Sequence, residues 1–145
     1  DAPNDLAGRS ELLFGAYMAG AALTGGFALQ HGLAHTLGGS FGVPHGEAHA
    51  VVLPYVTAYN TPFAQAEIAA VGQAMGVNNV AGAIYDLLRE LGLPTKLADV
   101  GVAQDDIERV LAITVETDNG LNPAPVTEEA TRQLVQAVFE GERPA

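Results

Sequence analysis

Apolar residues recur at helical spacing through the second half of the chain, and the stripes that they form predict three helices. The first stripe ends before Gly92 and Pro94, residue types that terminate helices, and consists of Val80, Ala83, Ile84, Leu87, Leu88 and Leu91. The second stripe consists of Ile107, Val110, Leu111 and Thr114. A third helix is expected after Thr127 as its N-cap, because Glu128 and Glu129 then lie in the first turn, where carboxylates stabilise the helix dipole.

The first half of the chain predicts further helices that glycines and prolines separate. Ser10 is a candidate N-cap, and a glycine pair at positions 25 and 26 permits a break. Pro44 suits the start of one helix, and Thr61 with Pro62 suits the start of the next. We therefore expect a glycine-rich loop from Gly38 to Pro44 and helices over residues 10–24, 27–37, 45–56 and 62–75.

No run of alternating apolar and polar residues predicts a β-strand. The nearest candidate, residues 97–102, is more consistent with a short connector. There is neither a GxGxxG motif after a strand nor a GxxxxGK[ST] motif, so any nucleotide site is expected to come largely from elsewhere. The sequence thus predicts an all-α, bundle-like architecture with a single helical domain over residues 1–145.

The charge balance and the lack of cysteine exclude several function classes. The net charge is −11, with only six Lys and Arg residues, whereas nucleic acids and anionic membrane surfaces require clustered basic residues. With no cysteine, the chain forms no disulfide, offers no thiolate metal ligand and has no Cys nucleophile. No basic segment precedes a cleavable apolar stretch, so we expect a cytoplasmic protein.

The segment from Leu12 to Gly46 contains no Asp, Glu, Lys or Arg and is long enough for a membrane span. Histidines, glycine pairs and a proline interrupt it, and flanking basic residues are lacking, so we expect instead a buried helix pair that lines a site. The glycines at positions 15, 20, 25 and 26 are interpreted as points of close helix packing. Tyr17, Tyr55 and Tyr59 are expected in the interior or at its rim.

All four histidines lie between residues 31 and 49, in two HxxxH pairs: His31 with His35, and His45 with His49. Residues four apart share one face of a helix, so each pair can point into a common space. Imidazole is neutral near pH 7 and is a frequent ligand of zinc and iron, but a catalytic metal takes three or more protein ligands. Glu47 could be a further ligand, but on an ideal helix it does not share the face of His45 and His49. A single histidine would more often be satisfied by a backbone carbonyl, whereas two pairs around a glycine turn favour a functional site.

The string HGLAHTLGGSFGVPHGEAHAVVLP, residues 31–54, resembles the signature region of the iron-containing (group III) alcohol dehydrogenases, as does the later NPAPVT. The resemblance extends from about Glu11 to Glu140. It implies the C-terminal helical domain of the dehydroquinate synthase-like fold, with the N-terminal α/β nucleotide domain absent. It also implies that His31 and His45 bind a divalent metal, iron or zinc, and that His35 lies beside the nicotinamide and substrate as a cofactor-binding and catalytic residue.

The segment PHGEAHAVVLPY, residues 44–55, is similar to the corresponding segment of maleylacetate reductases. His49 favours this subfamily, because many alcohol dehydrogenases of the family have an uncharged residue such as Asn at that position. The similarity implies that NADH or NADPH reduces maleylacetate, a dicarboxylate, to 3-oxoadipate in aromatic-compound degradation. His49 would then be a second catalytic residue that helps to recognise a carboxylate. The chain alone would be inactive, since the family's other two metal-ligand positions and its N-terminal partner domain lie upstream, and the full-length enzyme would be a homodimer.

Two alternatives stay open at this point. One is an iron- or zinc-dependent alcohol dehydrogenase of the same family. The other is a stand-alone metal-binding or interaction domain.

Overall fold

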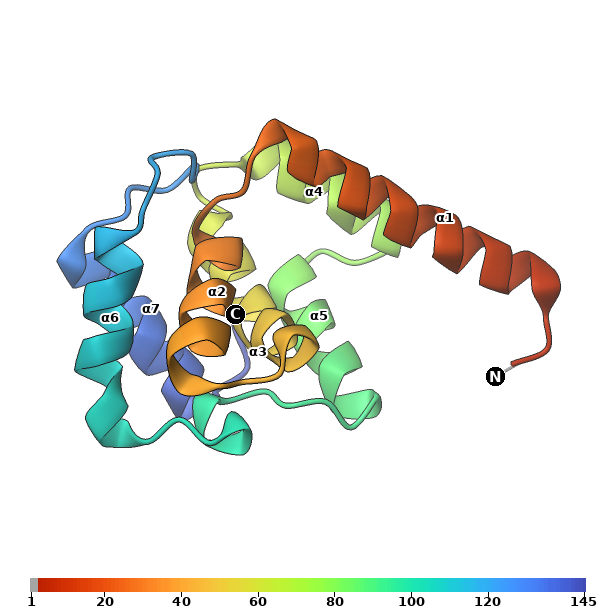
Figure 1. The fold of residues 1–145 in the computed structure, drawn as a ribbon. Helices are drawn as coiled ribbons and strands as arrows, with labels where there is room; N and C mark the ends of the chain where they lie inside the picture. The colour runs from red at the N-terminus through yellow and green to blue at the C-terminus, as the bar shows by residue number, and fades with distance from the viewer. Residues whose placement is uncertain (1–2) are drawn as a thin grey trace.

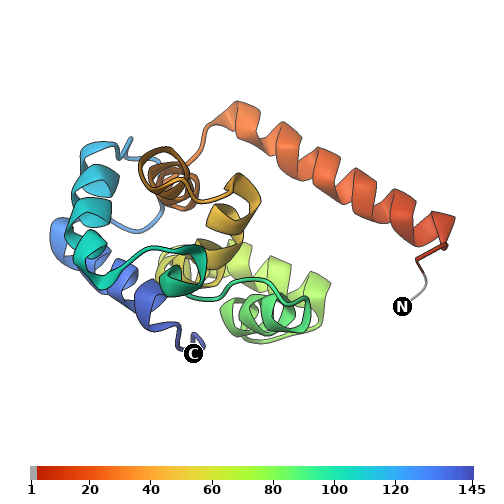
Figure 2. The same cartoon turned by 60° about the horizontal axis from the view of Figure 1, so that its bottom comes forward.

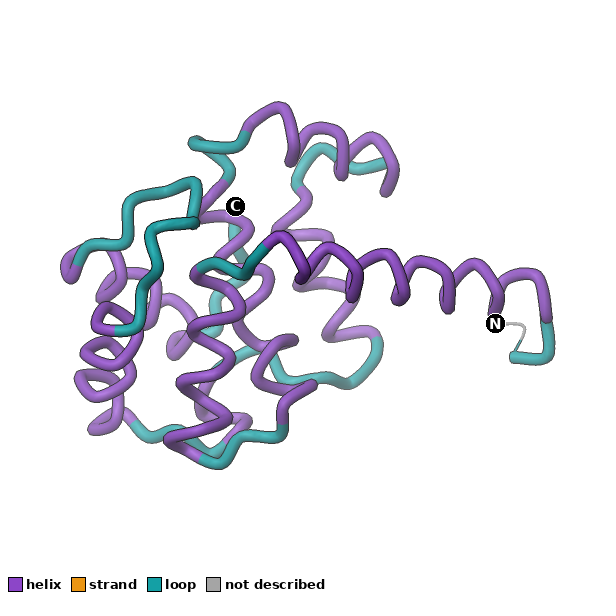
Figure 3. The backbone as a smooth tube through the Cα atoms, turned by 45° about the horizontal axis from the view of Figure 1, so that its top comes forward, coloured by secondary structure: helices purple, strands orange, loops and turns teal. Residues whose placement is uncertain are grey.

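The computed structural model describes residues 3–145, and within that range the regular elements are all helical (Figure 3). The α-helices are α1 (Leu6–Ala22), α2 (Leu29–Phe41), α3 (His45–Asn60), α4 (Gln65–Met75), α5 (Val80–Glu90), α6 (Ile107–Glu116) and α7 (Glu128–Glu140). Three short 3-10 helices complete the chain: η1 (Leu23–Gly25), η2 (Leu97–Val100) and η3 (Gln104–Asp106). The predicted all-α fold is confirmed, and the segment at 97–102 is indeed a connector.

The hydrophobic core lies around α3, which packs against α2, α5 and α7, while α6 packs against α2 and α7 (Figure 1). Each of these helices turns its apolar stripe inward, as burial of nonpolar surface favours. The fully buried side chains include Leu33, Leu37, Val51, Val52, Leu97, Val102, Val110, Val135 and Val138. The core therefore holds α2 and α3, the two helices that carry the histidines, against the rest of the bundle.

The NPAP motif, residues 122–125, forms hydrogen bonds with the end of α3. Asn60 and Asn122 exchange two amide hydrogen bonds, of 3.0 and 2.8 Å, and Asn122 also donates to the carbonyl of Ala124. The hydroxyl of Tyr59 donates to the carbonyl of Pro125. In this chain the motif thus has a structural role at the surface of the bundle.

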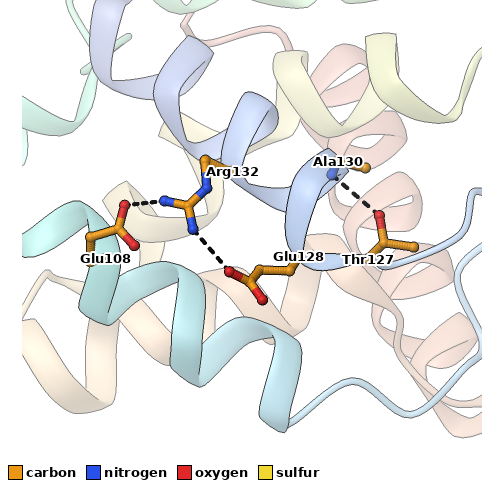
Figure 4. A network of polar contacts seen from close by, with 5 residues as sticks. All are labelled: Glu108, Thr127, Glu128, Ala130 and Arg132. Carbon is orange, nitrogen blue, oxygen red and sulfur yellow. Dashed lines mark hydrogen bonds and ion pairs between the residues drawn. The ribbon is translucent and has the colours of Figure 1, made fainter.

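Polar contacts on the surface join the later helices. Arg132 of α7 pairs with Glu108 of α6 and with Glu128 one turn earlier, and the hydroxyl of Thr127 accepts a hydrogen bond from the amide of Ala130 (Figure 4). The predicted N-cap of α7 is therefore confirmed. The exposed ion pairs are expected to contribute little to stability, because water screens them.

Several predicted helix boundaries were wrong. Helix α1 begins at Leu6 because the carboxylate of Asp5 caps it, and Ser10 instead donates to the carbonyl of Leu6. Helix α2 continues through Gly38 to Phe41, so the loop before α3 is only residues 42–44. Helix α4 begins at Gln65, because residues 61–63 form a turn. In addition, α3 runs past the predicted end to Asn60, with Pro54 inside it.

The expectation of a buried helix pair is correct for α2 and wrong for α1. Helix α1 has no buried residue and extends away from the bundle (Figures 1 and 2). A Cβ atom built on Gly15, Gly20 or Gly25 would meet nothing within 4 Å, so these glycines do not mark close packing here. Tyr17 is 68% exposed, against the expectation, whereas Tyr55 is buried and donates to the carbonyl of Thr95. Of the four glycines interpreted as packing points, only Gly26 has a close neighbour, the side chain of Leu121.

Among residues 3–145, no single helix is long and apolar enough to cross a membrane. The segments Leu6–Gly25 and Leu29–Phe41 pass that test only when taken together, across a bend of 96°.

Deleting residues 1–22 should leave the stability of the bundle nearly unchanged. Because α1 buries no side chain, we expect the free energy of unfolding to change by no more than about 0.5 kcal/mol, measured by urea denaturation. Deleting residues 128–145 is the contrasting control, since α7 buries Val135 and Val138, and this variant should not fold cooperatively. A large loss of stability on removal of α1 would show that the helix packs against the bundle in solution.

Candidate active site

The four histidine rings form one cluster between α2 and α3. Ring centroids are 4.4 Å apart for His31 and His35, and 4.5 Å apart for His45 and His49. Across the helices, His31 lies 4.5 Å from His49, and His35 lies 5.8 Å from His45. The two diagonals, His31 to His45 and His35 to His49, measure 6.2 and 6.5 Å. The rings thus sit at the corners of a small quadrilateral, which we call the histidine cluster.

The turn between α2 and α3 brings the two pairs together. Gly42 adopts a left-handed conformation, with φ of 70°, and the amide of Val43 donates to the carbonyl of Leu37, an arrangement that ends a helix. Helix α3 then starts at His45 directly after Pro44 and packs closely along α2. A side chain other than glycine at position 42 would be strained in this turn.

The cluster is open on one side and closed on the other. His35 and His45 are exposed, whereas His31 and His49 are half-buried. Residues two apart on a helix point to roughly opposite sides, so Leu33 and Leu37 face the core while His31 and His35 face outward. The Nε2 atom of His49 is buried and has no hydrogen-bond partner among the described residues. The cluster therefore offers a buried polar atom at its base and two accessible rings at its mouth.

Two residues that sequence reasoning missed complete the cluster. The ring of Phe27 lies 5.0 Å from His31 and 5.5 Å from His35, and its carbonyl accepts a hydrogen bond from Asn119. The side-chain nitrogen of Gln30 lies 3.1 Å from Nδ1 of His49 and 3.2 Å from the carbonyl oxygen of the same residue. Phe27 lies only four residues before His31, but no sequence pattern marks it as part of a site. Gln30 contacts a residue 19 positions away, so its role depends on how α3 packs on α2.

Comparison with known proteins identifies the family of this chain. The pattern described as "Fe-containing alcohol dehydrogenase family, C-terminal" matches residues 1–140. The chain belongs to the iron-containing alcohol dehydrogenase family. The family and helical domain expected from the sequence are thereby confirmed.

The relatives in this family include several maleylacetate reductases. Maleylacetate reductase 1 of Cupriavidus pinatubonensis is 41% identical over 143 residues, which are 98% of this chain and 40% of the relative. The crystal structure of maleylacetate reductase from Rhizobium sp. superposes with a TM-score of 0.76 at 38% identity, over 82% of this chain and 33% of that one. The iron-containing alcohol dehydrogenase of Corynebacterium glutamicum superposes with a TM-score of 0.89 at 36% identity, over 99% of this chain and 40% of that one. The chain thus spans about 40% of the length of the curated relatives that it matches.

A catalytic iron needs more ligands than the described residues bring together. Among residues 3–145, no group of three or more His, Asp or Glu side chains is placed to hold a metal ion. Glu47, the nearest carboxylate in sequence, is exposed. His31 and His45 would supply two imidazole nitrogens, and a metal held there would take its remaining ligands from outside this chain. Metal binding at these two residues therefore stays a prediction.

Burial and mutual repulsion keep the inner histidines neutral. Burial, together with the neighbouring rings of His31, His45 and His35, lowers the pKa of His49 to about 4. Burial, followed by His35 and His45, also lowers the pKa of His31. At neutral pH these two rings therefore act as neutral hydrogen-bonding groups and carry no positive charge.

The depressed pKa of His49 predicts a loss of stability in acid. In the unfolded chain the pKa is close to 6.5, so between pH 6.5 and about 4 the unfolded state binds the extra proton. The stability contribution is complete above pH 6.5 and is lost as the pH falls toward 4. Because His49 is only half-buried, solvent screening limits the loss to the order of 1 kcal/mol.

Urea denaturation of the wild type and of His49→Gln at pH 7 and pH 4.5 measures the stability that is lost through protonation of His49. The variant should lose less stability than the wild type over the same interval, since glutamine does not titrate. Equal losses in both proteins would contradict the lowered pKa of His49.

Proposed function

We propose that this chain forms the substrate-side wall of an NAD(P)H-dependent reductase that converts maleylacetate into 3-oxoadipate. The observation that carries the proposal is the position of His49, whose buried and unpartnered Nε2 lies at the base of a cluster with three other histidines. The maleylacetate reductases that the chain resembles, at 34–41% identity, support the same substrate. In this proposal, residues 1–145 are one helical domain that works with an α/β domain holding the nucleotide.

The chemistry of the substrate suits an imidazole-rich wall. Maleylacetate is a dicarboxylate with a keto group and a conjugated double bond, so its oxygens need hydrogen-bond donors. The chain has only six Lys and Arg residues, and the four histidines and Gln30 bring several polar groups together in the cluster. Neutral imidazoles with N–H groups supply donors without excess positive charge, and the exposed ring of Phe27 covers the side near His31 and His35.

In the proposed reduction the cofactor would supply the hydride, while residues of this chain bind the substrate and supply a proton. When bound, NAD(P)H would supply the hydride that reduces the conjugated double bond, and the resulting enolate of the substrate would carry its charge largely on the keto oxygen. His35, exposed at the mouth of the cluster, stabilises or protonates this enolate. His49, at the base, donates a hydrogen bond to a substrate carboxylate. His31 and His45 would hold a metal, or would bind further substrate oxygens in its absence.

An alcohol dehydrogenase is the second candidate function. The iron-containing alcohol dehydrogenase of C. glutamicum superposes over 99% of the chain with a TM-score of 0.89, so the fold is compatible with both reactions. Alcohol oxidation reverses the hydride transfer and needs a single oxygen-binding position, whereas a dicarboxylate needs several donors. The half-buried fourth histidine favours the dicarboxylate.

A chimera separates the two functions. In it, this chain replaces the matching part of maleylacetate reductase 1 of C. pinatubonensis, and consumption or formation of NADH is followed at 340 nm with maleylacetate or with short alcohols. Binding of NADH, measured by its fluorescence, shows that the chimera has assembled. We expect turnover of maleylacetate. Oxidation of alcohols by an assembled chimera that leaves maleylacetate unchanged would refute the proposal.

A further inference from the structure

Gln30 connects α2 to α3 at the closed side of the histidine cluster. Its side-chain nitrogen Nε2 lies 3.1 Å from Nδ1 of His49 and 3.2 Å from the carbonyl oxygen of His49. Both residues are half-buried, and they are 19 positions apart in the sequence. One side chain thus contacts both the ring and the backbone of a residue on the neighbouring helix.

The backbone contact fixes which end of the Gln30 amide faces His49. A carbonyl oxygen only accepts hydrogen bonds, so the group that approaches it must be the NH₂ and not the oxygen of the amide. An NH₂ group has two hydrogens, and one can be donated to the carbonyl while the other is donated to the imidazole. Nδ1 of His49 is therefore the acceptor in its contact with Gln30 and carries a lone pair.

The tautomer of His49 follows from this contact. A neutral imidazole has one N–H, and with a lone pair on Nδ1 the hydrogen resides on Nε2. This atom is buried without a partner, and the ring centroids of His31 and His45 both lie 4.5 Å from that of His49. His49 thus directs an unused N–H toward the interior of the cluster. A ligand oxygen that enters the cluster would satisfy it.

We propose that Gln30 is a positioning residue that holds His49 as the Nε2–H tautomer, so that His49 serves as a hydrogen-bond donor to a carboxylate oxygen and not as a metal ligand. A nitrogen that carries a hydrogen has no lone pair for a metal, so Nε2 of His49 cannot bind a metal in this tautomer. The identity of the acceptor, a substrate carboxylate, rests on the proposed function. The tautomer itself rests only on the contacts of Gln30.

Nitrogen-15 NMR of the 145-residue chain measures the tautomer directly, because protonated and unprotonated imidazole nitrogens have well-separated chemical shifts. For His49 at pH 7 we expect a protonated Nε2 and an unprotonated Nδ1. In Gln30→Glu, the carboxylate can only accept, so Nδ1 should become protonated. Gln73→Glu, at an exposed position of α4, adds the same charge outside the cluster and should leave the His49 signals unchanged. A protonated Nδ1 with an unprotonated Nε2 in the wild type would overturn the proposal.

Metal binding gives a second readout that does not depend on activity. With its lone pair on Nε2, His49 of Gln30→Glu can join His31 and His45 as a third imidazole ligand. Titration with Co²⁺, followed by its visible absorption, should show binding roughly 10-fold tighter than in the wild type or in Gln73→Glu. Equal affinity in all three proteins would contradict the role of Gln30 in keeping His49 from the metal.

The chimera tests the carboxylate partner. Gln30→Glu should raise KM for maleylacetate roughly 10-fold and change kcat less, because the donor is lost in substrate binding. An unchanged KM, in a protein whose His49 has changed its tautomer, would refute the carboxylate as the acceptor. The NMR result is obtained without substrate, so a failure of the proposed reductase activity and a failure of the tautomer assignment are distinguishable.

Discussion

Replacing His35 by alanine should lower kcat of the chimera for maleylacetate by about 10²- to 10⁴-fold, the range that a single positioned acid–base group contributes. His35 is exposed at the mouth of the histidine cluster, 4.4 Å from His31 and 5.8 Å from His45 between ring centroids. Of the two histidines of α2, His35 is exposed and His31 is half-buried. Steady-state assays with NADH and maleylacetate give both kcat and KM.

The fold should tolerate this substitution. The side chain of His35 points away from Leu33 and Leu37, which fill the core on the other face of α2, so alanine leaves no buried cavity. Ser40→Ala on the same helix is the matched control, because Ser40 lies beyond the cluster and should keep kcat within about twofold. A His35→Ala chimera that binds NADH and retains kcat within threefold would exclude His35 as the proton donor.

The sequence predicted those elements that have a single apolar stripe. Helices α5 and α7 have apolar residues on one face, and their positions in the structure agree with expectation. Thr127 was predicted as the cap of α7, whereas Asn79, which caps α5, was not predicted. Their boundaries are set by residues within one or two turns, and such local interactions are readable without knowledge of the fold. The HxxxH spacing belongs to the same class, because four residues make one turn of a single helix.

The position of helix α1 outside the bundle could not be predicted from its own sequence. Its apolar residues lie all around the helix, including Leu13, Phe14 and Tyr17, so the sequence contains no stripe that marks a buried face. Uniform hydrophobicity suggested burial, and only the tertiary arrangement shows that α1 lies outside the bundle. At Gly38 the sequence predicted the start of a loop, but this residue is helical, because α2 ends only where Gly42 takes a positive φ.

The candidate site was predictable as a set of residues and not as a geometry. The resemblance assigned roles to all four histidines, but whether the two pairs face one another depends on how α3 packs on α2. The contact from Gln30 to His49 depends on the same packing, and nothing in the local sequence distinguishes this glutamine from others. Only the folded chain shows that Gln30 contacts Nδ1 of His49 and leaves Nε2 without a partner among the described residues.

Leu37→Ala should destabilise the chain by about 2–5 kcal/mol, the cost of removing a large side chain from a closely packed core. Leu37 is fully buried, one helical turn from Leu33 on the inner face of α2. Because its carbonyl also accepts the amide hydrogen bond of Val43, this residue lies where the core meets the turn into α3. Loss of packing there should loosen both helices that hold the histidines.

Urea denaturation at pH 7 measures the effect, and a lower midpoint with an unchanged slope would identify a loss of stability within two-state unfolding. Leu53→Ala on α3 is the matched control, since Leu53 is 38% exposed and should cost less than about 1 kcal/mol. If the core positions the cluster, Leu37→Ala should also broaden the His31 and His49 signals in ¹⁵N NMR at pH 7, while Leu53→Ala should leave them sharp. Sharp, unshifted histidine signals in a strongly destabilised Leu37→Ala would mean that the α2–α3 turn alone, and not the core beneath it, sets the geometry of the cluster.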